Sequence, residues 1–213
     1  NDNQYNQQWF LPQINANDAW DFWDIGGGDI PGDKSILLAS VDTGVDWDHP
    51  DLRNNIWNNP GEDADGDGVT IVQQGNTWVF DPDDINGIDD DGNGFIDDFI
   101  GWDCSGYSSD IGSIVGGPDN NPLPPLGVSS GGTWAHGTHV AGLLSATTNN
   151  NTGIASAAFN CSIMAVKVST GEQDYPYITH GYDGILYAAK AGFYAGDFTI
   201  INNSWGGIGY SQL

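Results

Sequence analysis

The fold of this chain is decided by residues 35–44, which read Ser-Ile-Leu-Leu-Ala-Ser-Val-Asp-Thr-Gly. The first seven form an apolar run whose only polar members are two small serines. Such a run is typical of a strand buried on both faces of a parallel sheet. It stops at Asp42, and Thr43-Gly44 supplies the turn. The sequence therefore predicts a carboxylate at the carboxyl end of a buried strand, where functional groups gather in such sheets.

Further segments extend this strand into an α/β pattern. Ser162–Val168 and Phe198–Asn202 are apolar runs of strand length. His136–Thr147 is rich in small and apolar residues, and Ile178–Gly192 has helical spacing of its apolar positions. Strands that alternate with helices predict a parallel sheet covered by helices. A short helix is also expected in the N-terminal arm, near Ala16–Trp23.

A long segment inside this pattern, at about residues 53–132, has no predicted helix or strand and is rich in Gly, Pro, Asn and Asp. No internal repeat or linker sets it apart, so we take residues 1–213 as part of one domain that carries this insert. A structureless insert of this length is unusual in a compact domain unless something orders it. Bound metal ions are the expected ordering element.

The first predicted helix opens with His-Gly-Thr-His-Val-Ala-Gly at residues 136–142. His136 stands 136 − 42 = 94 residues after Asp42. Together they could form a general base, in which the carboxylate holds one imidazole tautomer and the imidazole takes a proton from a nucleophile. A zinc site on His136 and His139 is a weaker alternative. The zinc-protease pattern spaces its histidines i, i+4 with a Glu between them.

Three blocks of the sequence resemble the subtilisin-like serine protease family. The first is Val-Asp-Thr-Gly-Val-Asp at residues 41–46, followed by His-Pro-Asp-Leu at 49–52. The second is the His136 block, and the third is Asn-Asn-Ser-Trp-Gly-Gly at 202–207. The blocks stand in the chain order of that family, with Asp before His.

The resemblance implies a role for each matching residue. Asp42 would orient His136, which would act as general base and then as general acid, while His139 would be structural. An extended edge after the last predicted strand would bind substrate as an added strand and line the pocket for the residue before the scissile bond. That edge is formed by Ser204, Trp205 and Gly206.

The sequence also departs from the family. The block Gly-Thr-Ser, with the nucleophile, has no match in these 213 residues, and neither has the later Asn that donates to the oxyanion. Ser204 does not replace the nucleophile, because no helix start follows its turn. We therefore expect an incomplete subtilisin-like parallel-sheet fold, without the C-terminal strands and the nucleophile block. Such a fragment should be inactive alone, with the C-terminal part of the same protease as its partner.

The composition limits the partners and the location of the protein. With 29 acidic and 4 basic residues, its formal charge is −25, which makes nucleic acid and anionic membranes poor partners. No run approaches the ~20 apolar residues of a membrane span. Abundant Asn and Asp, few Lys and no basic, apolar leader predict a mature, secreted protein in an extracellular medium. Cys104 and Cys161 could pair or could remain buried thiols.

Two Asp-rich loops have the oxygen spacing of calcium ligands. Counted from Asp89, Gly94 occupies the sixth position of the second loop, where an EF-hand loop turns sharply. The carbonyl of Phe95 occupies the seventh position. Ordinary Asp/Gly-rich turns are the alternative for both loops. The ligands predicted for the first loop are Asp63, Asp65 and Asp67, and those for the second are Asp89, Asp91, Asn93, Phe95, Asp97 and Asp98, with Asp98 in place of the usual final Glu.

The family resemblance implies a third Ca²⁺ site, which would tie the N-terminal arm to the core. Its side-chain ligands would be Asp2, Asp51 of the His-Pro-Asp-Leu block, and Asn150. The run Asn149–Asn151 leaves the last assignment open by one position.

The main competing function is a calcium-binding or adhesion module that is not an enzyme, since a fold does not fix a function. The pairing of Asp42 with His136 argues for the protease, because a binding module has no use for a general base.

Overall fold

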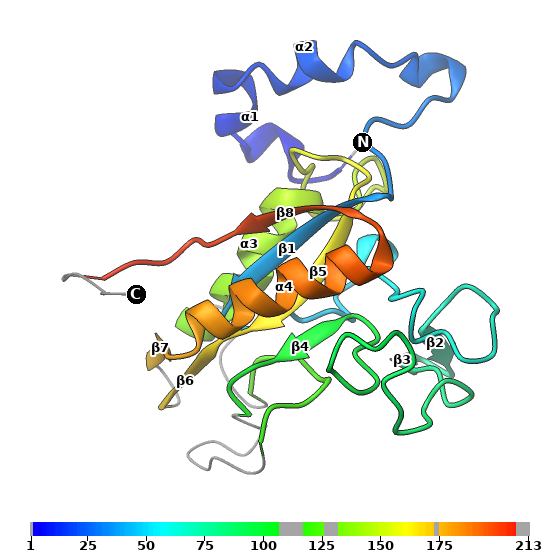
Figure 1. Ribbon diagram of the computed structural model, residues 1–213. Helices are drawn as coiled ribbons and strands as arrows, with labels where there is room; N and C mark the ends of the chain where they lie inside the picture. The colour runs from blue at the N-terminus through cyan, green and yellow to red at the C-terminus, as the bar shows by residue number, and fades with distance from the viewer. Residues whose placement is uncertain (1, 107–116, 126–131, 173–174, 208–213) are drawn as a thin grey trace.

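The computed structural model describes residues 2–106, 117–125, 132–172 and 175–207. Parts of the predicted insert, residues 107–116 and 126–131, lie outside the described residues. The central sheet contains four parallel strands in the order β4-β5-β1-β8 (Figure 1). The predicted α/β class with a parallel sheet is therefore confirmed. The strands are β1 (Ile36–Asp42), β4 (Gly101–Asp103), β5 (Ser162–Lys167) and β8 (Phe198–Asn202).

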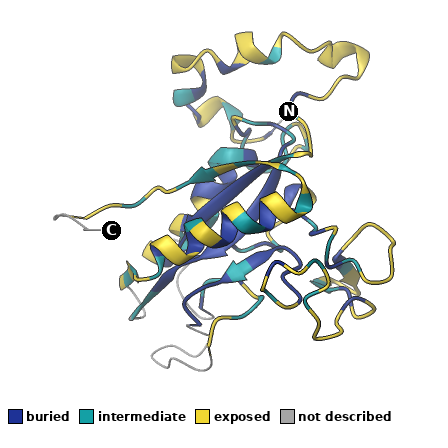
Figure 2. Ribbon diagram, viewed as in Figure 1, coloured by how far each residue is buried: buried dark blue, intermediate teal, exposed yellow. Residues whose placement is uncertain are grey.

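Two helices cover the two faces of this sheet: α3 (His136–Ser145) and α4 (Gly181–Ala195). Because side chains alternate along a strand, β1 and β5 present different residues to each helix. Val41 and Val166 pack with Tyr187 of α4, whereas Ala165 packs with Ala141 of α3. Figure 2 shows both central strands buried between the helices. Burial on both faces explains why the interiors of β1 and β5 are almost entirely apolar.

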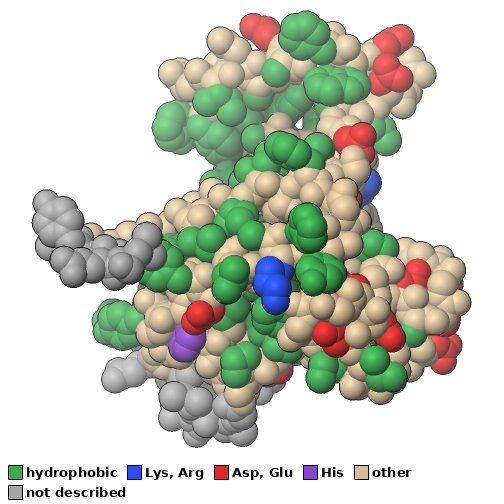
Figure 3. All heavy atoms as spheres, in the orientation of Figure 1, with side chains coloured by type: hydrophobic (Ala, Val, Ile, Leu, Met, Phe, Trp, Pro, Cys, Tyr) green, Lys and Arg blue, Asp and Glu red, His purple; other side chains and the backbone are tan. Residues whose placement is uncertain are grey.

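The outer face of α4 is exposed and carries several hydrophobic side chains (Figures 2 and 3). Leu186 and Phe193 are the most exposed apolar residues of this helix. The apolar surface continues onto β8, where Phe198 and Ile200 are exposed. Within the described residues β8 pairs with β1 alone, so it is an edge strand of the sheet.

The predicted insert contains more regular structure than the sequence indicated. The hairpin of β2 (Ile71–Gln74) and β3 (Thr77–Phe80) lies within it, as does a 3₁₀ turn at Arg53–Asn55. Strand β4 also falls inside the insert and belongs to the central sheet, where Gly101 pairs with Ala165. The prediction of an irregular segment was wrong there. Three residues flanked by Asp and Gly give no periodic signal, and long-range pairing with β5 forms the strand.

The remaining elements lie at the two ends of the described chain. The N-terminal arm has a 3₁₀ turn at Tyr5–Gln7, helices α1 (Phe10–Gln13) and α2 (Ala16–Trp20), and a second 3₁₀ turn at Ile25–Gly27. A last 3₁₀ turn, Thr133–Ala135, leads into α3. A second hairpin, β6 (Ser169–Glu172) with β7 (Tyr175–Ile178), precedes α4. The helix predicted to begin at Ile178 therefore begins three residues later, because Ile178 ends this hairpin.

Cys104 and Cys161 are both buried free thiols, so the alternative of a disulfide is not realised. Burial raises the pKa of the Cys104 thiol to about 12, which keeps it protonated and unreactive at neutral pH. Among the described residues, no helix combines the length and the apolar character needed to cross a membrane.

Candidate functional site

Asp42 and His136 meet where β1 ends and α3 begins. Oδ1 of Asp42 lies 2.7 Å from Nδ1 of His136. The Asp42 side chain is 1% exposed and that of His136 is 45% exposed. Contact with the carboxylate places the ring proton on Nδ1 and leaves Nε2 as the proton acceptor. The backbone N–H of Thr43 also donates to Oδ1 of Asp42 at 2.7 Å. The arrangement is a buried carboxylate that orients a partly exposed base.

Small residues around this pair allow the helix to approach the strand end. A Cβ on Gly137 would collide with the backbone oxygen of Gly44 and crowd Asp42. The N–H of Gly137 donates to Oγ1 of Thr43 at 2.9 Å, and this hydroxyl donates to the carbonyl of Trp134 at 3.0 Å. Thr43 therefore links the turn after β1 to both sides of His136.

This close approach gives a test of the fold. We expect Gly137→Ala to destabilise the protein by about 1–3 kcal/mol, the usual cost of overpacking a tight contact. That cost exceeds the gain of up to ~1 kcal/mol from replacing a helical Gly by Ala. Urea unfolding of the purified protein measures the difference.

Gly142→Ala in the same helix is the matched control, because its new Cβ would meet only side-chain ends, at 3.4 Å or more. This variant should be as stable as the parent or more stable. A Gly137→Ala protein that unfolds at the parent's urea concentration would contradict the close-packing argument.

The segment Ser204–Gly206 follows β8 and lies beside Asp42. Ser40 pairs with Asn202, so the residues after Asn202 run level with the end of β1. The indole N–H of Trp205 donates to the carbonyl of Val41 at 2.8 Å, which fixes the segment next to the strand that bears Asp42. Ser204 and Gly206 are exposed. Ser204 accepts a hydrogen bond from the Asn202 amide at 2.9 Å, and no bond joins it to His136. Its placement fits a substrate-binding edge and not a nucleophile.

A buried carboxylate cluster lies in the insert and contains Asp91, Asp98 and Glu62. One oxygen from each lies within 4.8 Å of the others. Burial is the main cause that raises the pKa of Asp98 to about 8 and that of Glu62 to about 7, and neighbouring carboxylates add to both shifts. The amides of Asn59 and Asn93 donate to Asp98 at 2.9 and 3.1 Å. The three carboxylates offer oxygen ligands, which suit a hard cation such as Ca²⁺.

Glu62, which the sequence did not single out, lies in this cluster with the predicted ligands Asp91 and Asp98. The predicted ligands Asp89 and Asp97 are not among these three residues, and their carboxylates accept hydrogen bonds from the N–H groups of Gly94 and Gly87. The ring of Phe95 packs against the rings of Trp102 and Tyr187. Its carbonyl stays the predicted ligand atom. The sequence offered one signal that Glu62 is distinct: it is one of only two glutamates among the 29 acidic residues.

The first predicted loop forms a second cluster. Asp63, Asp65 and Asp67 each offer an oxygen within 4.8 Å of the others. Asp84, which the sequence did not single out, joins this loop because its Oδ1 accepts the N–H of Ala64 at 2.8 Å. Asp84 is completely buried, and its Oδ2 has no partner among the described residues. Burial raises the pKa of Asp84, and the charges of nearby aspartates raise it further.

The three residues expected to form the third site come together at the N-terminal arm. The amide of Asn150 donates to Oδ1 of Asp51 at 2.9 Å, so Asn150 is the member of the Asn run that reaches it. Asp2 accepts the N–H groups of Asn149 and Asn150, both at 3.0 Å. Asp2 is thus one link that ties the arm to the loop after α3.

Comparison with known proteins agrees with this geometry. Residues 33–212 match the profile of the subtilase family (peptidase S8). This chain belongs to the subtilase family.

Several curated proteins are similar to this subtilase chain. It is 33% identical over 171 residues to an extracellular basic protease of Dichelobacter nodosus, which covers 79% of this chain and 22% of that protein. It is 29% identical over 154 residues to a halolysin of Haloferax mediterranei, covering 72% and 18%. It is 28% identical over 192 residues to the halolysin-like extracellular serine protease Nep of Natrialba magadii, covering 90% and 24%. The chain therefore spans about a fifth of the length of these relatives.

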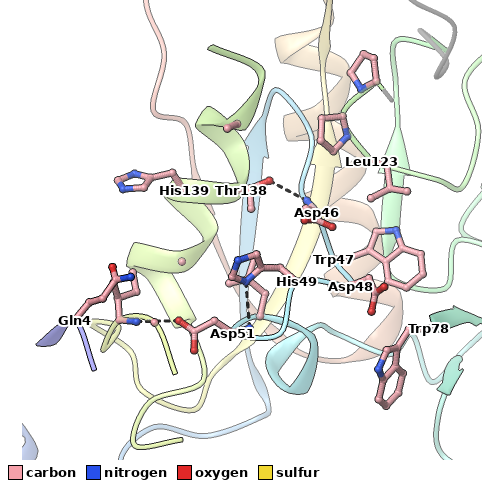
Figure 4. A pocket seen from close by; sticks show the side chains of 17 residues that line it. Gln4, Asp46, Trp47, Asp48, His49, Asp51, Trp78, Leu123, Thr138 and His139 are labelled. Carbon is pink, nitrogen blue, oxygen red and sulfur yellow. Dashed lines mark hydrogen bonds between the residues drawn. The ribbon is translucent and has the colours of Figure 1, made fainter. Parts of the chain in front are cut away.

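A cleft of about 660 Å³ runs along α3 of this subtilase, where Thr138 and His139 line it (Figure 4). His139, expected to be structural, lines this cleft, and of the two histidines in the motif His136 is the one hydrogen-bonded to Asp42. The cleft is lined, among others, by Asp46, Trp47, Asp48 and His49 from the segment after β1, by Trp78, Leu123, Pro124 and Pro125 from the insert, and by Ala135, Thr138, His139 and Gly142 from α3 and the turn before it.

Proposed function

We propose that this subtilase chain is the part of a secreted, calcium-stabilised serine endopeptidase that supplies the aspartate and the histidine of an Asp-His-Ser triad. The single observation that carries the proposal is the 2.7 Å contact between Oδ1 of Asp42 and Nδ1 of His136, which leaves Nε2 as the acceptor. Both side chains come from the sequence blocks of the family, and the similar proteins are named proteases.

In the proposed mechanism, Nε2 of His136 takes the proton of a serine hydroxyl as that oxygen attacks the peptide carbonyl. The negative charge of Asp42 stabilises the imidazolium, which then gives its proton to the leaving amine. No described hydroxyl group is hydrogen-bonded to His136, so the serine is proposed to come from the further length of the protease. This chain by itself is expected to be inactive.

The proposed substrate is an unstructured polypeptide that binds along Ser204–Gly206 as an added strand. Support comes from the exposure of Ser204 and Gly206 and from the hydrogen bond between Trp205 and Val41, which holds the segment beside β1. The segment would bind the residues before the scissile bond.

Ca²⁺ is the proposed structural ion, and secretion is proposed because such ions are plentiful outside cells. Buried carboxylates without a cation are costly, and the completely buried Oδ2 of Asp84 is such a group. Calcium would neutralise charge in the insert and at the arm. The residues that would hold it are Glu62, Asp91 and Asp98 in one site, Asp63, Asp65, Asp67 and Asp84 in a second, and Asp2, Asp51 and Asn150 in a third.

The catalytic assignment predicts the effect of removing the base. In the full-length protease, His136→Ala should lower casein hydrolysis by a factor of about 10⁴ or more, as loss of a triad member does. His180→Ala is the control, because His180 is a half-buried residue whose ring contacts Thr179 and not Asp42. If His136→Ala hydrolyses casein at the parent's rate, the proposed mechanism is wrong.

The calcium assignment predicts that Glu62→Gln changes the melting temperature differently in calcium and in chelator. Excess chelator should lower the melting temperature of the parent, since each site filled at 100 times its Kd adds about 2.7 kcal/mol. Glu62→Gln should melt below the parent in calcium. In chelator at pH 8 it should melt at the same temperature or higher, because it lacks one buried charge.

Differential scanning calorimetry measures these shifts, with the exposed Asp18→Asn as the control of equal charge change. A parent whose melting curve is the same in calcium and in chelator would contradict the structural role of the ion.

A further inference from the structure

Several parts of the chain line the cleft along α3, and at one end these include Gln4 of the N-terminal arm, Asp51, and Gly153 and Ile154 of the loop after α3. The floor of the cleft is the segment after β1, from Asp46 to His49, and one wall is α3. The opposite wall is formed by Leu123–Pro125 and by Trp78 of the insert hairpin. The walls are mostly apolar, and the volume of about 660 Å³ is within the range of sites that take a side chain or a small ligand.

The cleft reaches the residue that precedes the proposed catalytic histidine. Ala135, which lines it, directly precedes His136. The floor is fixed to the same helix because the N–H of Asp46 donates to Oγ1 of Thr138 at 2.9 Å. The far wall is held at the turn after Asp42, where the N–H of Val45 donates to the carbonyl of Pro122 at 2.9 Å.

The cleft and the Ser204–Gly206 edge flank Asp42 from opposite sides. The segment that continues into Leu123–Pro125 starts at Asp119, which bridges to Asp103 of β4. In the sheet order β4-β5-β1-β8, this anchor lies on the side of β1 away from β8. A polypeptide that is held at Ser204–Gly206 and crosses His136 therefore continues toward the cleft.

The described lining of the cleft carries the carboxylates of Asp46, Asp48 and Asp51. Oδ1 of Asp48 is buried without a hydrogen-bond partner among the described residues. Asp46 lies close enough for burial and the charge of Asp48 to raise its pKa, which His49 opposes. Nδ1 of His49 accepts the N–H of Asp51 at 3.1 Å, so its neutral ring carries the proton on Nε2. None of the described lining residues is Lys or Arg.

We propose that this cleft binds a Lys or Arg side chain of the polypeptide substrate, located after the scissile bond, and that Asp46 and Asp48 select it. The inference rests on the proposed protease function. The apolar walls suit the aliphatic stem of such a side chain, and the two carboxylates suit its charged head. Trp78 already accepts a cation, since the guanidinium carbon of Arg53 lies 5.6 Å from its ring centre. Asp46 and Asp48 do not join a described group of three metal-ligating side chains, which favours an organic cation over a metal ion.

The test uses the full-length protease and quenched fluorescent peptides that are identical before the scissile bond. One of the three positions after that bond carries Lys, norleucine or Glu. At one position we expect kcat/KM for Lys to exceed that for norleucine by about tenfold at low salt, and the ratio to fall as salt screens the charges. Asp46→Asn/Asp48→Asn should reduce the ratio to about one, and Asp48→Lys should favour Glu. The exposed Asp18→Asn should keep the ratio of the parent.

Other outcomes distinguish failure of the cleft assignment from failure of the proposed protease function. If norleucine peptides are cleaved without a preference for Lys, or if the preference survives in the double Asn variant, the cleft assignment is wrong and the protease function stands. If no peptide is cleaved, the protease function fails. The cleft is then tested by calorimetric titration of the Lys and norleucine peptides into the His136→Ala protein, where equal Kd values would overturn it.

Discussion

The site depends on one contact, the approach of the first turn of α3 to the turn after β1. Gly137 lies against the backbone of Gly44, and a single hydroxyl, that of Thr43, accepts a hydrogen bond from Gly137 and donates one to the carbonyl before α3. A separation of 2.7 Å between Asp42 and His136 is possible only because no side chain intervenes. The glycines and the threonine of the two motifs are therefore as necessary as the ionisable residues, because they set the distance over which those residues act.

The buried charges of the protein are distributed differently in the central sheet and in the insert. The charged residues of the sheet lie at strand ends, where Asp42 contacts His136 and Lys167 pairs with Asp103 at 2.7 Å. The carboxylates whose pKa burial raises to about 7 and about 8, Glu62 and Asp98, are in the insert. The two regions are joined by Tyr187 of α4, whose hydroxyl donates to Asp98 at 2.7 Å while its ring packs under β1. An ion held by Asp98 would therefore stabilise more than a surface loop, because it would also fix a residue of the main core.

The parts of the structure that could be predicted from the sequence are those with local causes. Strands β1 and β8 were located within one residue, because burial on both faces or against a helix leaves an apolar run of fixed length. Strand β4 and the ligand-like position of Glu62 were missed, because each depends on residues far away in the chain. The buried Asp84 was missed for the same reason: its neighbours are set by the path of the insert and not by its own spacing.

The arrangement around His136 is asymmetric, and this asymmetry follows from the order of the strands. On the β8 side, the proposed substrate-binding segment would pair with a polypeptide through its backbone, irrespective of side chains. On the β4 side, the insert contributes a wall to a cleft with Asp46 and Asp48 at its floor, which we propose to discriminate by charge. The wall of that cleft comes from the same insert that contains the carboxylate clusters. Metal ions that order the insert would therefore also order the wall, so the acidic loops would contribute to recognition as well as to stability.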